Sequence, residues 1–486
     1  MVSFILPGNS ASTGYEVDNS LRFNDGSTDH LDRTFGSAGN RRTFTISFWA
    51  KLTGNNTPSQ SAMFGAIFDA AQDGSNSDDL YFHTHRLNFS GYYGSTQYQL
   101  RTTAKYRDPS AWYHFVVAFD TTQSTASNRI KIYANGVQET EFDNETYPSQ
   151  DFQTTYINTA RLHNIGTLVD GDGFPLDGYL AEFVFIDGQQ LLPTSFGEFD
   201  EDTGIWKPID VSGLTFGTNG FYLEFKQSGT SQNSSGLGAD TSGNDNHFAV
   251  SNLTNIDQST DTCTNNFATM NPLVVNTSAE SSFAEGNLQV STTDSGVFGA
   301  VSTIGVSSGK WYWEVKPTQI ENKNAIGVTA AASADAINNH RPGDGSYSAG
   351  IRSSGDAKLN GSSESGSWDS FTTSDIVGVA LDLDNNKLYF SKNGTFMNSG
   401  NPTSGSTGTG AISLTDPAST TDGFYFFAFG DPGAGSGTAN IAQFNFGSPP
   451  YSISSGNADA NGFGNFEYSV PSGYYALNTS NLNTYG

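Results

Sequence analysis

The chain has 486 residues, with 22 Lys and Arg against 49 Asp and Glu, which gives a formal net charge of −27 and a pI near 4.3. A protein that binds nucleic acid needs clustered cations, so this balance argues against nucleic acid and anionic membrane surfaces as partners. Only 15% of the residues are charged, whereas Gly occupies 54 positions and aromatic residues make up 13%. These figures predict aromatic cores under an uncharged polar surface, as is typical of β-rich proteins displayed outside cells or on virions.

The cysteine content and the apolar segments limit the cell compartments in which the protein is expected. Cys263 is the single cysteine, so no disulfide can form within the chain. The first ten residues lack the basic region of a signal peptide, and no window holds the roughly 18 apolar residues of a membrane span. We therefore expect a protein made in a cytoplasm, without membrane insertion, whose surface resembles that of displayed proteins.

Alternation of apolar and polar residues predicts strands along the whole chain, and no stretch shows a sustained, capped helical pattern. In the first half, the alternation predicts strands at residues 21–23, 43–52, 80–88, 112–120, 130–134 and 178–186. Asn135-Gly136 is a strong hairpin signal because both turn positions need positive φ. Asp187-Gly188 ends the last of these strands with a second turn pair.

Four of these segments resemble the laminin-G-like, concanavalin-type jelly roll. The matching strings, in the family's order, are residues 46–50 (ISFWA), 112–115 (WYHF), 132–136 (IYANG) and 176–183 (LDGYLAEF). The resemblance covers roughly residues 15–200 and implies a two-sheet β-sandwich. We assign residues 1–204 to this domain.

The second half resembles a SPRY domain, again in order. The matching strings are residues 308–315 (SGKWYWEV), 325–328 (AIGV), 374–384 (SDIVGVALDLD), 388–394 (LYFSKNG) and 442–447 (AQFNFG). We assign residues 284–448 to this domain, which the resemblance predicts to be a second sandwich. Val377, Val379, Leu381 and Leu383 share one face, so residues 377–390 are predicted to form a hairpin with one buried face.

The segments outside the two domains are richer in small polar residues. Residues 205–283 are predicted to be a linker or connector because residues 228–243 are almost wholly Gly, Ser, Asn, Thr and Asp, although residues 221–225 indicate a strand. Residues 449–486 are predicted to be a C-terminal tail. Strings at residues 240–248, 264–272 and 471–482 resemble segments of SPRY-containing proteins of marine bacteriophages. The predicted fold class is all-β: two antiparallel β-sandwich domains joined by a Gly/Ser/Asn-rich linker.

Three strings resemble motifs of catalysis or phosphate binding, but each lacks a residue or a structural context that the motif requires. Residues 198–203 (EFDEDT) have Thr203 where the Glu-x-Asp-x-x-Glu pattern of jelly-roll glycoside hydrolases has its second Glu. Residues 305–309 (GVSSG) lead into a strand, whereas a nucleophile elbow needs a strand, a turn and then a helix. The Gly-x-Gly strings at Gly171, Gly343 and Gly462 lack the third glycine of a dinucleotide loop. We therefore expect no enzymatic activity.

Metal-binding patterns are also weak. His83 and His85 are two residues apart on a predicted strand, but no Cys lies near them, so solvent-facing histidines are favoured over a zinc site. Asp170, Asp172 and Asp177 offer the oxygen ligands that calcium prefers, and the jelly-roll resemblance implies calcium at such loops. A Gly/Asp turn without metal is the favoured interpretation, and calcium is the alternative.

The SPRY resemblance implies that partners bind loops at one end of the sandwich. In this sequence those loops include residues 338–344, residues 352–356 and the surroundings of Trp368. Arg and aromatic side chains contribute strongly at binding patches. The predicted ligand-binding side chains are therefore His340, Arg341, Tyr347 and Trp368. Trp368 could equally belong to the core.

Together these features favour a non-enzymatic virion protein of a tailed phage, such as a tail fibre, spike or surface appendage. It would attach to a host-surface glycan or protein by weak loop contacts that many copies make effective. We expect it to be released by host lysis, to form a homo-oligomer and to contact other virion proteins. A capsid-decorating or connector protein is the main alternative, followed by a glycan-active enzyme and a bacterial adhesin.

Overall fold

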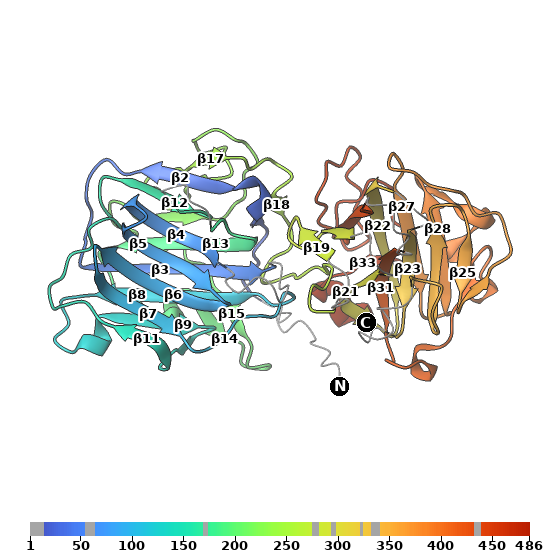
Figure 1. Cartoon of the computed structure of the whole chain (residues 1–486), viewed down its shortest axis with the longest axis horizontal. Coiled ribbons are helices and arrows are strands. Elements are labelled where there is room, and N and C mark those ends of the chain that lie inside the picture. The colour runs from blue at the N-terminus through green and yellow to red at the C-terminus, as the bar shows by residue number, and fades with distance from the viewer. Residues whose placement is uncertain are drawn as a thin grey trace. The chain divides into compact units, whose positions relative to one another are not determined.

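The computed structural model describes residues 14–53, 64–168, 174–274, 281–292, 298–320, 324–331, 341–431 and 439–486. Almost every regular element among them is a β-strand, which confirms the predicted all-β fold class. The chain divides into two compact units, whose boundary lies between Asn265 and Asn266 (Figure 1). We call them the N-terminal unit and the C-terminal unit.

The N-terminal unit consists of two antiparallel sheets, here named A and B. Sheet A has the order β10-β9-β8-β3-β13-β1-β18, and β16 also pairs with β13. Its strands are β1 (Ser20–Phe23), β3 (Thr43–Leu52), β8 (Tyr113–Asp120), β9 (Ile130–Ala134), β10 (Val137–Gln138), β13 (Gly178–Asp187), β16 (Phe221–Leu223) and β18 (Gln258–Ser259). Most of these strands lie where the alternation predicts them.

Sheet B has the order β11-β7-β6-β5-β4-β12-β2-β17. Its strands are β2 (His30–Thr34), β4 (Phe64–Asp73), β5 (Asn76–His83), β6 (Arg86–Tyr93), β7 (Thr96–Thr102), β11 (Phe142–Thr146), β12 (Leu162–Ile165) and β17 (Ala249–Ser251). A separate hairpin is formed by β14 (Gly197–Phe199) and β15 (Trp206–Pro208). Short 3-10 turns occur at Asp25–Ser27, Ala126–Asn128 and Pro193–Ser195.

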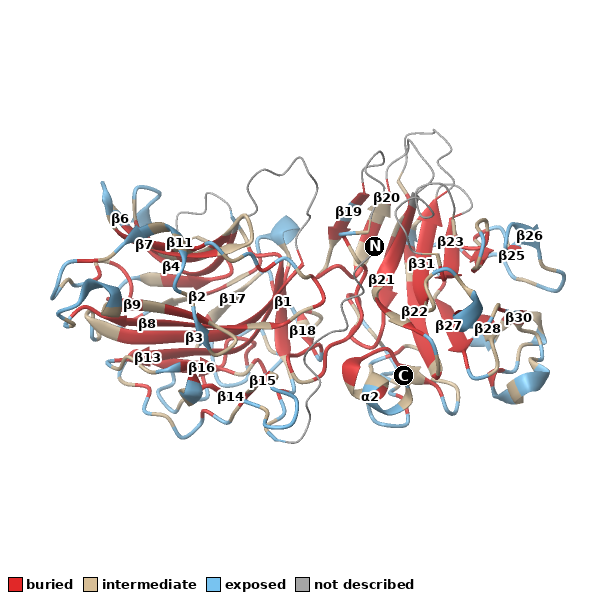
Figure 2. Cartoon of the chain, turned by 90° about the horizontal axis from the view of Figure 1, so that it is seen from below, coloured by how far each residue is buried: buried red, intermediate tan, exposed pale blue. Residues whose placement is uncertain are grey.

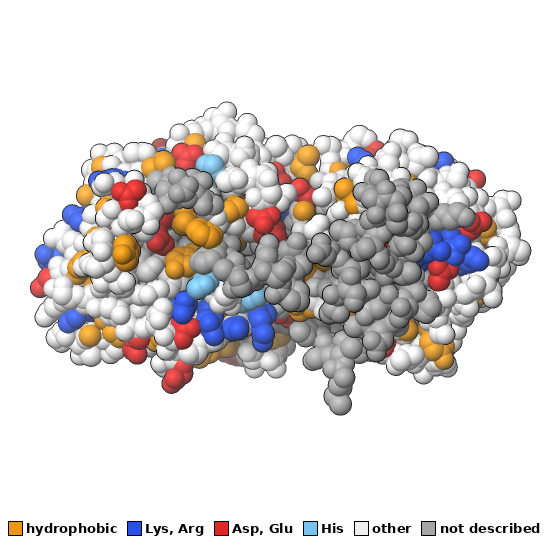
Figure 3. Space-filling view, viewed as in Figure 1, with side chains coloured by type: hydrophobic (Ala, Val, Ile, Leu, Met, Phe, Trp, Pro, Cys, Tyr) orange, Lys and Arg blue, Asp and Glu red, His pale blue; other side chains and the backbone are white. Residues whose placement is uncertain are grey.

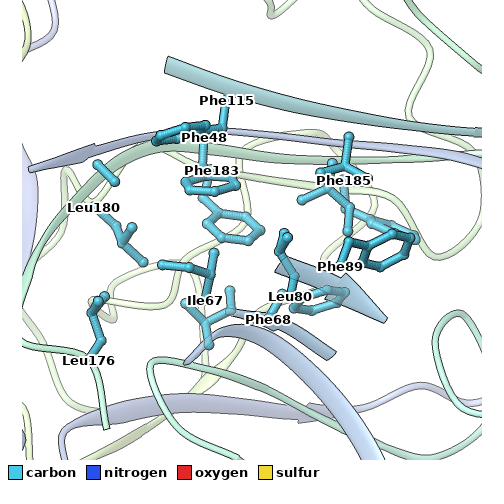
Figure 4. Close-up of a cluster of buried hydrophobic side chains, with 14 of the residues drawn as sticks. Phe48, Ile67, Phe68, Leu80, Phe89, Phe115, Leu176, Leu180, Phe183 and Phe185 are labelled. Atoms are coloured by element: carbon cyan, nitrogen blue, oxygen red, sulfur yellow. The ribbon is translucent and has the colours of Figure 1, made fainter. Parts of the chain in front are cut away.

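The core of the N-terminal unit lies between sheets A and B (Figure 4). Phe48 of β3 stacks on Phe115 and Phe183 of the neighbouring strands, with ring centroids 5.5 and 5.6 Å apart. Phe68 of sheet B lies 6.0 Å from Phe183 and so joins the two layers. Every second residue of β3 thus points into the aromatic core, as the alternation predicts.

The outer face of sheet A is covered by parts of residues 190–265, chiefly by Phe196, Trp206, Val211 and Phe216. Val184 and Ile186 of β13 pack there against Phe216 and Tyr222. Trp49 belongs to a second cluster on this face. As a result, all ten residues of β13 are buried.

The structure differs from the predicted linker at residues 205–283. Residues 205–265 belong to the N-terminal unit, because β16, β17 and β18 extend its two sheets. Asp261 forms an ion pair with Lys51 at 2.7 Å, and both side chains are almost wholly buried. The segment is polar, but its acids are partners for buried cations and its few large apolar residues, such as Phe221 and Phe248, enter the core.

The predicted strand at residues 80–88 is also wrong. The structure has two strands, β5 and β6, joined by a turn at Thr84 and His85, both with positive φ, 50° and 65°. Neither residue is a usual choice for such a turn, so the hairpin carries no Asn-Gly type of signal. His83 and His85 consequently do not share a strand face.

The C-terminal unit also consists of two sheets, here named C and D. Sheet C has the order β19-β20-β32-β22-β27-β28-β29, with β30 on β28 and β33 on β22. Its strands are β19 (Ser281–Ala284), β20 (Gln289–Thr292), β22 (Lys310–Gln319), β27 (Val377–Asp382), β28 (Lys387–Lys392), β29 (Thr395–Phe396), β30 (Ile412–Ser413), β32 (Ile441–Asn445) and β33 (Tyr475–Ala476).

Sheet D has the order β21-β31-β23-β24-β25-β26. Its strands are β21 (Phe298–Val306), β23 (Ala325–Thr329), β24 (Ser348–Arg352), β25 (Ala357–Leu359), β26 (Ser362–Ser363) and β31 (Tyr425–Asp431). Short 3-10 turns at Met397–Ser399, Pro402–Thr407 and Pro417–Ser419 and one α-helix, α2 (Thr479–Tyr485), complete the described elements.

The predicted hairpin of β27 and β28 is confirmed, but both of its faces are buried (Figure 2). Val379 and Leu381 point into the core between the sheets, as predicted. Ala380 points the other way, where Phe466 and Tyr474 of the C-terminal segment cover it. Residues 449–486 are therefore not a free tail but a packed layer on sheet C.

Candidate functional site

The outer face of sheet B is polar and partly exposed, in contrast to the covered face of sheet A. On β5, Leu80 and Phe82 are buried in the core, whereas Asp79, Tyr81 and His83 point outward and are partly exposed. The same alternation continues on β7, whereas on β6 the outward Asn88 and Ser90 are themselves buried. This period-2 pattern is what a sheet with one open face requires.

Strand register aligns the outward residues into a polar row across five strands. The row runs through Asn164, Asp69, Asp79, Ser90 and Gln99, each paired with the next in the register. Directly opposite residues in a sheet lie about 4.5–5.5 Å apart at Cβ, so neighbours in the row are close together. Asn164, Asp69 and Ser90 are buried, and only Asp79 and Gln99 of the row are partly exposed.

Hydrogen bonds orient part of this face. Gln99 Nε2 donates to Asn88 Oδ1 at 2.8 Å, and Asn88 Nδ2 donates to Ser90 Oγ at 3.0 Å. Ser77 Oγ donates to Asp79 Oδ2 at 2.6 Å. The polar groups therefore have fixed directions before any ligand arrives, which lowers the entropic cost of binding.

A pocket of about 160 Å³ lies beside Asp79, the middle residue of the row. Asp79, Tyr81, Leu168 and Phe174 line it, and Figure 3 shows a group of hydrophobic side chains on this face of the N-terminal unit. Phe174 is 41% exposed and has a φ of 66°, a strained value for an aromatic residue. The pocket is smaller than the roughly 300–1,000 Å³ of drug-sized sites, so it suits a shallow contact.

Electrostatics at the pocket follow from partial burial. Burial, followed by the charge of Asp79, raises the pKa of the Tyr81 hydroxyl, so this group stays protonated at neutral pH. The pocket thus combines two aromatic rings, one hydroxyl and one carboxylate. Apolar ring faces beside hydrogen-bonding groups are the chemistry that sugar rings and their hydroxyls fit.

Two carboxylates meet in the row, because Asp69 and Asp79 are register partners. Retaining glycoside hydrolases place two carboxyl groups about 5–5.5 Å apart, one on each side of the scissile bond. Asp69, however, is only 1% exposed, so of this pair only Asp79 reaches the pocket. The pocket therefore does not offer a ligand two acids.

A buried Ser–His pair in sheet A is likewise not suited to catalysis. His114 Nε2 lies 2.9 Å from Ser47 Oγ, and Trp206 Nε1 donates to His114 Nδ1 at 3.0 Å. Since the indole only donates, Nδ1 is an acceptor and the ring proton sits on Nε2, where it points at the serine. Nε2 therefore donates to the serine and has no lone pair to accept the serine proton. Burial also lowers the pKa of His114 to about 3, which makes the ring a weak base.

The other catalytic motifs lie in plain turns and strands. Residues 198–203 form the β14–β15 hairpin, where Asp200 accepts hydrogen bonds from the Thr203 backbone and hydroxyl. Residues 305–309 connect β21 to β22, in agreement with the predicted strand context.

The predicted SPRY loop residues are only partly brought together. Arg341 and Arg352 share the carboxylate of Asp344, at 2.8 and 2.5 Å. Tyr347 and Trp368 are half-buried against the core of the C-terminal unit, and the Trp368 ring meets Phe390 edge-on at 6.4 Å. His340 lies outside the described residues. The role of these four residues in ligand binding stays a prediction.

The metal predictions stay open in the same way. Asp170 and Asp172 lie outside the described residues, and Asp177 accepts a hydrogen bond from the Thr53 hydroxyl at 3.3 Å. Among the residues that the structure describes, no three His, Cys, Asp or Glu side chains gather in a metal-binding group. His83 and His85 therefore belong to no such group within the described residues. Burial lowers the pKa of both histidines, helped by nearby Arg and Lys charges.

Sequence analysis missed the pocket residues Asp79, Tyr81 and Phe174. The available signal was the alternation in residues 76–102, which marks three consecutive strands with a polar outer face. The hairpin between β5 and β6 hid this signal because its turn lacks the usual residues. Nothing in the sequence placed Phe174 beside Tyr81, 93 positions earlier.

Comparison with protein families gives two matches. Residues 25–189 match the concanavalin A-like lectin/glucanases superfamily, and residues 310–410 match the SPRY domain. The chain therefore contains a concanavalin A-like domain and a SPRY domain, as the resemblances implied. No curated protein sequence matches the chain.

Solved structures give further likenesses. The SPRY domain of human HERC1 has 14% identity, a TM-score of 0.24 and coverage of 32% of this chain and 87% of its own. A heptameric SAP-like pentraxin from Limulus polyphemus has 17% identity, a TM-score of 0.26 and coverage of 36% and 78%. A candidate carbohydrate-binding protein from Bacteroides ovatus has 11% identity, a TM-score of 0.30 and coverage of 46% and 56%. Because these TM-scores are below 0.5, the fold assignment rests on the family matches and the strand order.

In the described part of the chain, no helix has the length and apolar character to cross a bilayer.

Proposed function

We propose that the protein binds carbohydrate through the outer face of sheet B, and that it serves as a non-enzymatic attachment protein of a tailed-phage virion. The observation that carries the binding proposal is the pocket of Asp79, Tyr81, Leu168 and Phe174 on a partly exposed polar sheet face. The match of this domain to a superfamily of lectins and glucanases supports it.

Binding rather than hydrolysis is supported by the single carboxylate of the Asp69–Asp79 pair that reaches the pocket. A glycoside hydrolase needs one carboxyl group as acid and a second as base or nucleophile. We propose that Asp79 accepts hydrogen bonds from sugar hydroxyls, while Tyr81 and Phe174 contact the apolar face of a sugar ring.

The virion role is supported by resemblance. Residues 240–248, 264–272 and 471–482 resemble segments of SPRY-containing proteins of marine phages. A small, shallow pocket gives weak binding, which many copies on one particle would strengthen through a high effective concentration. In this proposal the protein is a homo-oligomer on the particle, and the loops around Arg341 and Trp368 contact another virion protein or a host protein.

The binding proposal is tested with the purified full chain on a panel of immobilised polysaccharides. We expect Tyr81→Ala and Phe174→Ala to weaken binding about tenfold or more, because each removes one aromatic contact. Tyr92→Ala is the matched control, since Tyr92 is as exposed as Phe174, at 41%, but does not line the pocket. Equal binding by all three variants and the native chain would contradict the proposed site.

Two further measurements test the remaining parts. Release of reducing ends from any bound polysaccharide would overturn the non-enzymatic assignment. Mass spectrometry and imaging of purified phage particles should find the protein on their surface, and its absence would overturn the virion role. If the protein is present but the soluble chain fails to block adsorption to host cells, decoration of the particle replaces attachment.

A further inference from the structure

Basic side chains gather at the end of sheet B where β5 turns into β6. Arg86 begins β6, Arg101 lies on β7, and Lys105 and Arg107 follow β7. The last two act on His85 electrostatically, and the Tyr106 N–H donates to the His85 carbonyl at 2.8 Å. Figure 3 shows basic and histidine side chains grouped beside the hydrophobic group on this face. Such a group is unexpected in a chain with a net charge of −27.

Two of these cations share one acid. Arg101 Nε donates to Asp143 Oδ1 at 2.6 Å, and Arg86 Nη1 lies 3.1 Å from Asp143 Oδ2. Two guanidinium groups and one carboxylate leave a net charge of +1. The buried Arg86 Nε has no hydrogen-bond partner among the described residues. The group is therefore ordered, partly buried and positive, and one of its donors is unmatched.

His83 connects this basic group to the pocket. Arg101 Nη1 lies 2.8 Å from His83 Nδ1, and because a guanidinium only donates, Nδ1 accepts. The ring proton is then on Nε2. Burial, with the charges of Arg101 and Arg86, lowers the pKa of His83, which keeps the ring neutral at pH 7.

The outer face of β5 thus changes character along the strand. Asp79, Tyr81 and His83 follow one another at intervals of two residues, each about 6.8 Å long. Register places Arg86 opposite His83 and Asn88 opposite Tyr81, and Arg101 of β7 follows opposite Asn88. The charge of Arg101 acts on the Tyr81 hydroxyl across Asn88. An apolar contact at Tyr81 and Phe174 is therefore adjacent to a cationic contact at Arg86 and Arg101.

We propose that the carbohydrate bound at this face is acidic, with a carboxylate or sulfate group at Arg86 and Arg101 and a sugar ring on Tyr81 and Phe174. This inference rests on the proposed carbohydrate binding and adds its substrate class. Nucleic acid fits less well, because a continuous polyphosphate crossing this face would also meet Asp79 and the strongly negative chain. An acidic glycan can place its charged group at the basic end and its hydroxyls at Asp79.

The test uses the full chain and two pairs of polymers that differ in their acidic groups. Polygalacturonate and its methyl ester differ in the carboxylate, and dextran sulfate and dextran differ in the sulfate. We expect about tenfold tighter binding to the acidic member of at least one pair at low salt, with the preference declining as salt screens the charges. The pair that shows the preference identifies carboxylate or sulfate.

Charge variants connect the preference to the basic group. Arg86→Gln with Arg101→Gln should abolish the acidic preference, while binding to the neutral polymer remains. Asp143→Asn should strengthen acidic binding about threefold, because it removes the shared negative charge, and it guards against misfolding of the double variant. Lys131→Gln is the control, since Lys131 lies on β9 of sheet A.

The possible results separate failure of the acidic-glycan inference from failure of the proposed carbohydrate binding. Equal binding to both members of each pair, or an unchanged preference in the double variant, would overturn the acidic-glycan inference but leave carbohydrate binding intact. Absence of binding to all four polymers and to the wider polysaccharide panel would overturn both. Binding of a single-stranded oligonucleotide that depends on Arg86 and Arg101, without polysaccharide binding, would replace the glycan by nucleic acid.

Discussion

Sheets A and B of the N-terminal unit have strands with a similar alternation of apolar and polar residues, but their outer faces lie in different environments. Both alternate apolar and polar residues, for example in β3 (TFTISFWAKL) and β5 (NSDDLYFH). The outward residues Asp79, Tyr81 and His83 of β5 remain partly exposed, and Asp79 and Tyr81 line the candidate site. Those of β3 from Thr45 onward are buried, because Phe196, Trp206, Phe216 and their neighbours cover the outer face of sheet A.

A polar position on a strand therefore does not establish an exposed surface. Thr45 Oγ1 donates to the Gln189 carbonyl at 2.8 Å, Ser47 pairs with His114, and Lys51 pairs with Asp261. Each polar group on the covered face has found a partner within the segment above it or on the neighbouring strand. Among the described residues, no comparable layer covers the pocket of sheet B, so Asp79, Tyr81 and Phe174 keep exposed surface.

The strongest test of the covered face is its buried ion pair. Asp261→Ala would leave the Lys51 ammonium, which is 0% exposed, without its carboxylate, and would also remove the acceptor of the Trp112 indole N–H. Loss of one partner of a buried pair costs about 3–5 kcal/mol. We expect this loss in urea unfolding of the full chain, as a downward shift of the N-terminal unit's midpoint.

Asp202→Ala is the control for this prediction, because Asp202 lies in the exposed β14–β15 turn. The combined replacement of Lys51 by Met and Asp261 by Leu should recover much of the lost stability, since an apolar pair needs no desolvated charge. A native-like midpoint for Asp261→Ala would show that residues 205–265 do not depend on this contact.

A second test is the pH dependence of the covered face. Glu182 lies in a bulge of β13 at a φ of 50°, and it accepts hydrogen bonds from the hydroxyls of Tyr15 and Tyr222. Burial raises the pKa of Glu182 from its usual 4.5 to about 7. Between these values the folded chain binds more protons than the unfolded chain, so the contribution of Glu182 to stability falls as the pH rises.

Glu182→Gln removes this titration. We expect the difference in unfolding free energy between the native chain and Glu182→Gln to fall by roughly 2–3 kcal/mol from pH 5 to pH 8 and to level off above pH 7. Denaturant unfolding at a series of pH values measures it. Parallel profiles for the two proteins would mean that Glu182 is charged in the folded state.

The smallest effect on stability is expected on the polar face of sheet B. Tyr81→Ala removes a partly exposed ring from an outer face, so the unfolding free energy should change by about 1 kcal/mol or less. The same variant should lose most carbohydrate binding. A large drop in stability would show that Tyr81 supports the sheet, and the contrast between the two faces would then be weaker.

The C-terminal unit repeats the covered arrangement. Glu314 of β22 accepts hydrogen bonds from the backbone N–H groups of Glu467 and Tyr468, at 2.9 and 2.8 Å. Asp459 accepts from the Ala476 N–H at 2.9 Å. Acids in the predicted tail and on sheet C are thus buried acceptors, and small polar residues again form a layer rather than a solvated chain.

Much of the fold followed from the sequence alone. The alternation at residues 43–52, 178–186 and 377–390 places strands correctly because side-chain direction in a strand repeats every two residues. The Asn135-Gly136 turn is found as predicted, with φ values of 45° and 78°. Both domain resemblances depend on such local strings, and the family matches confirm them.

Tertiary structure alone decided which polar residues are buried and which are available to a ligand. Lys51 and Asp261 are 210 positions apart, and their local sequences give no sign of a buried pair. Tyr81 and Phe174 likewise come from distant segments, although both line one pocket. Local pattern determines which side of a strand a residue faces, but the layer that packs on that side is set by contacts between remote parts of the chain. The function proposed for sheet B depends on these contacts between remote segments, because they leave its outer face partly exposed.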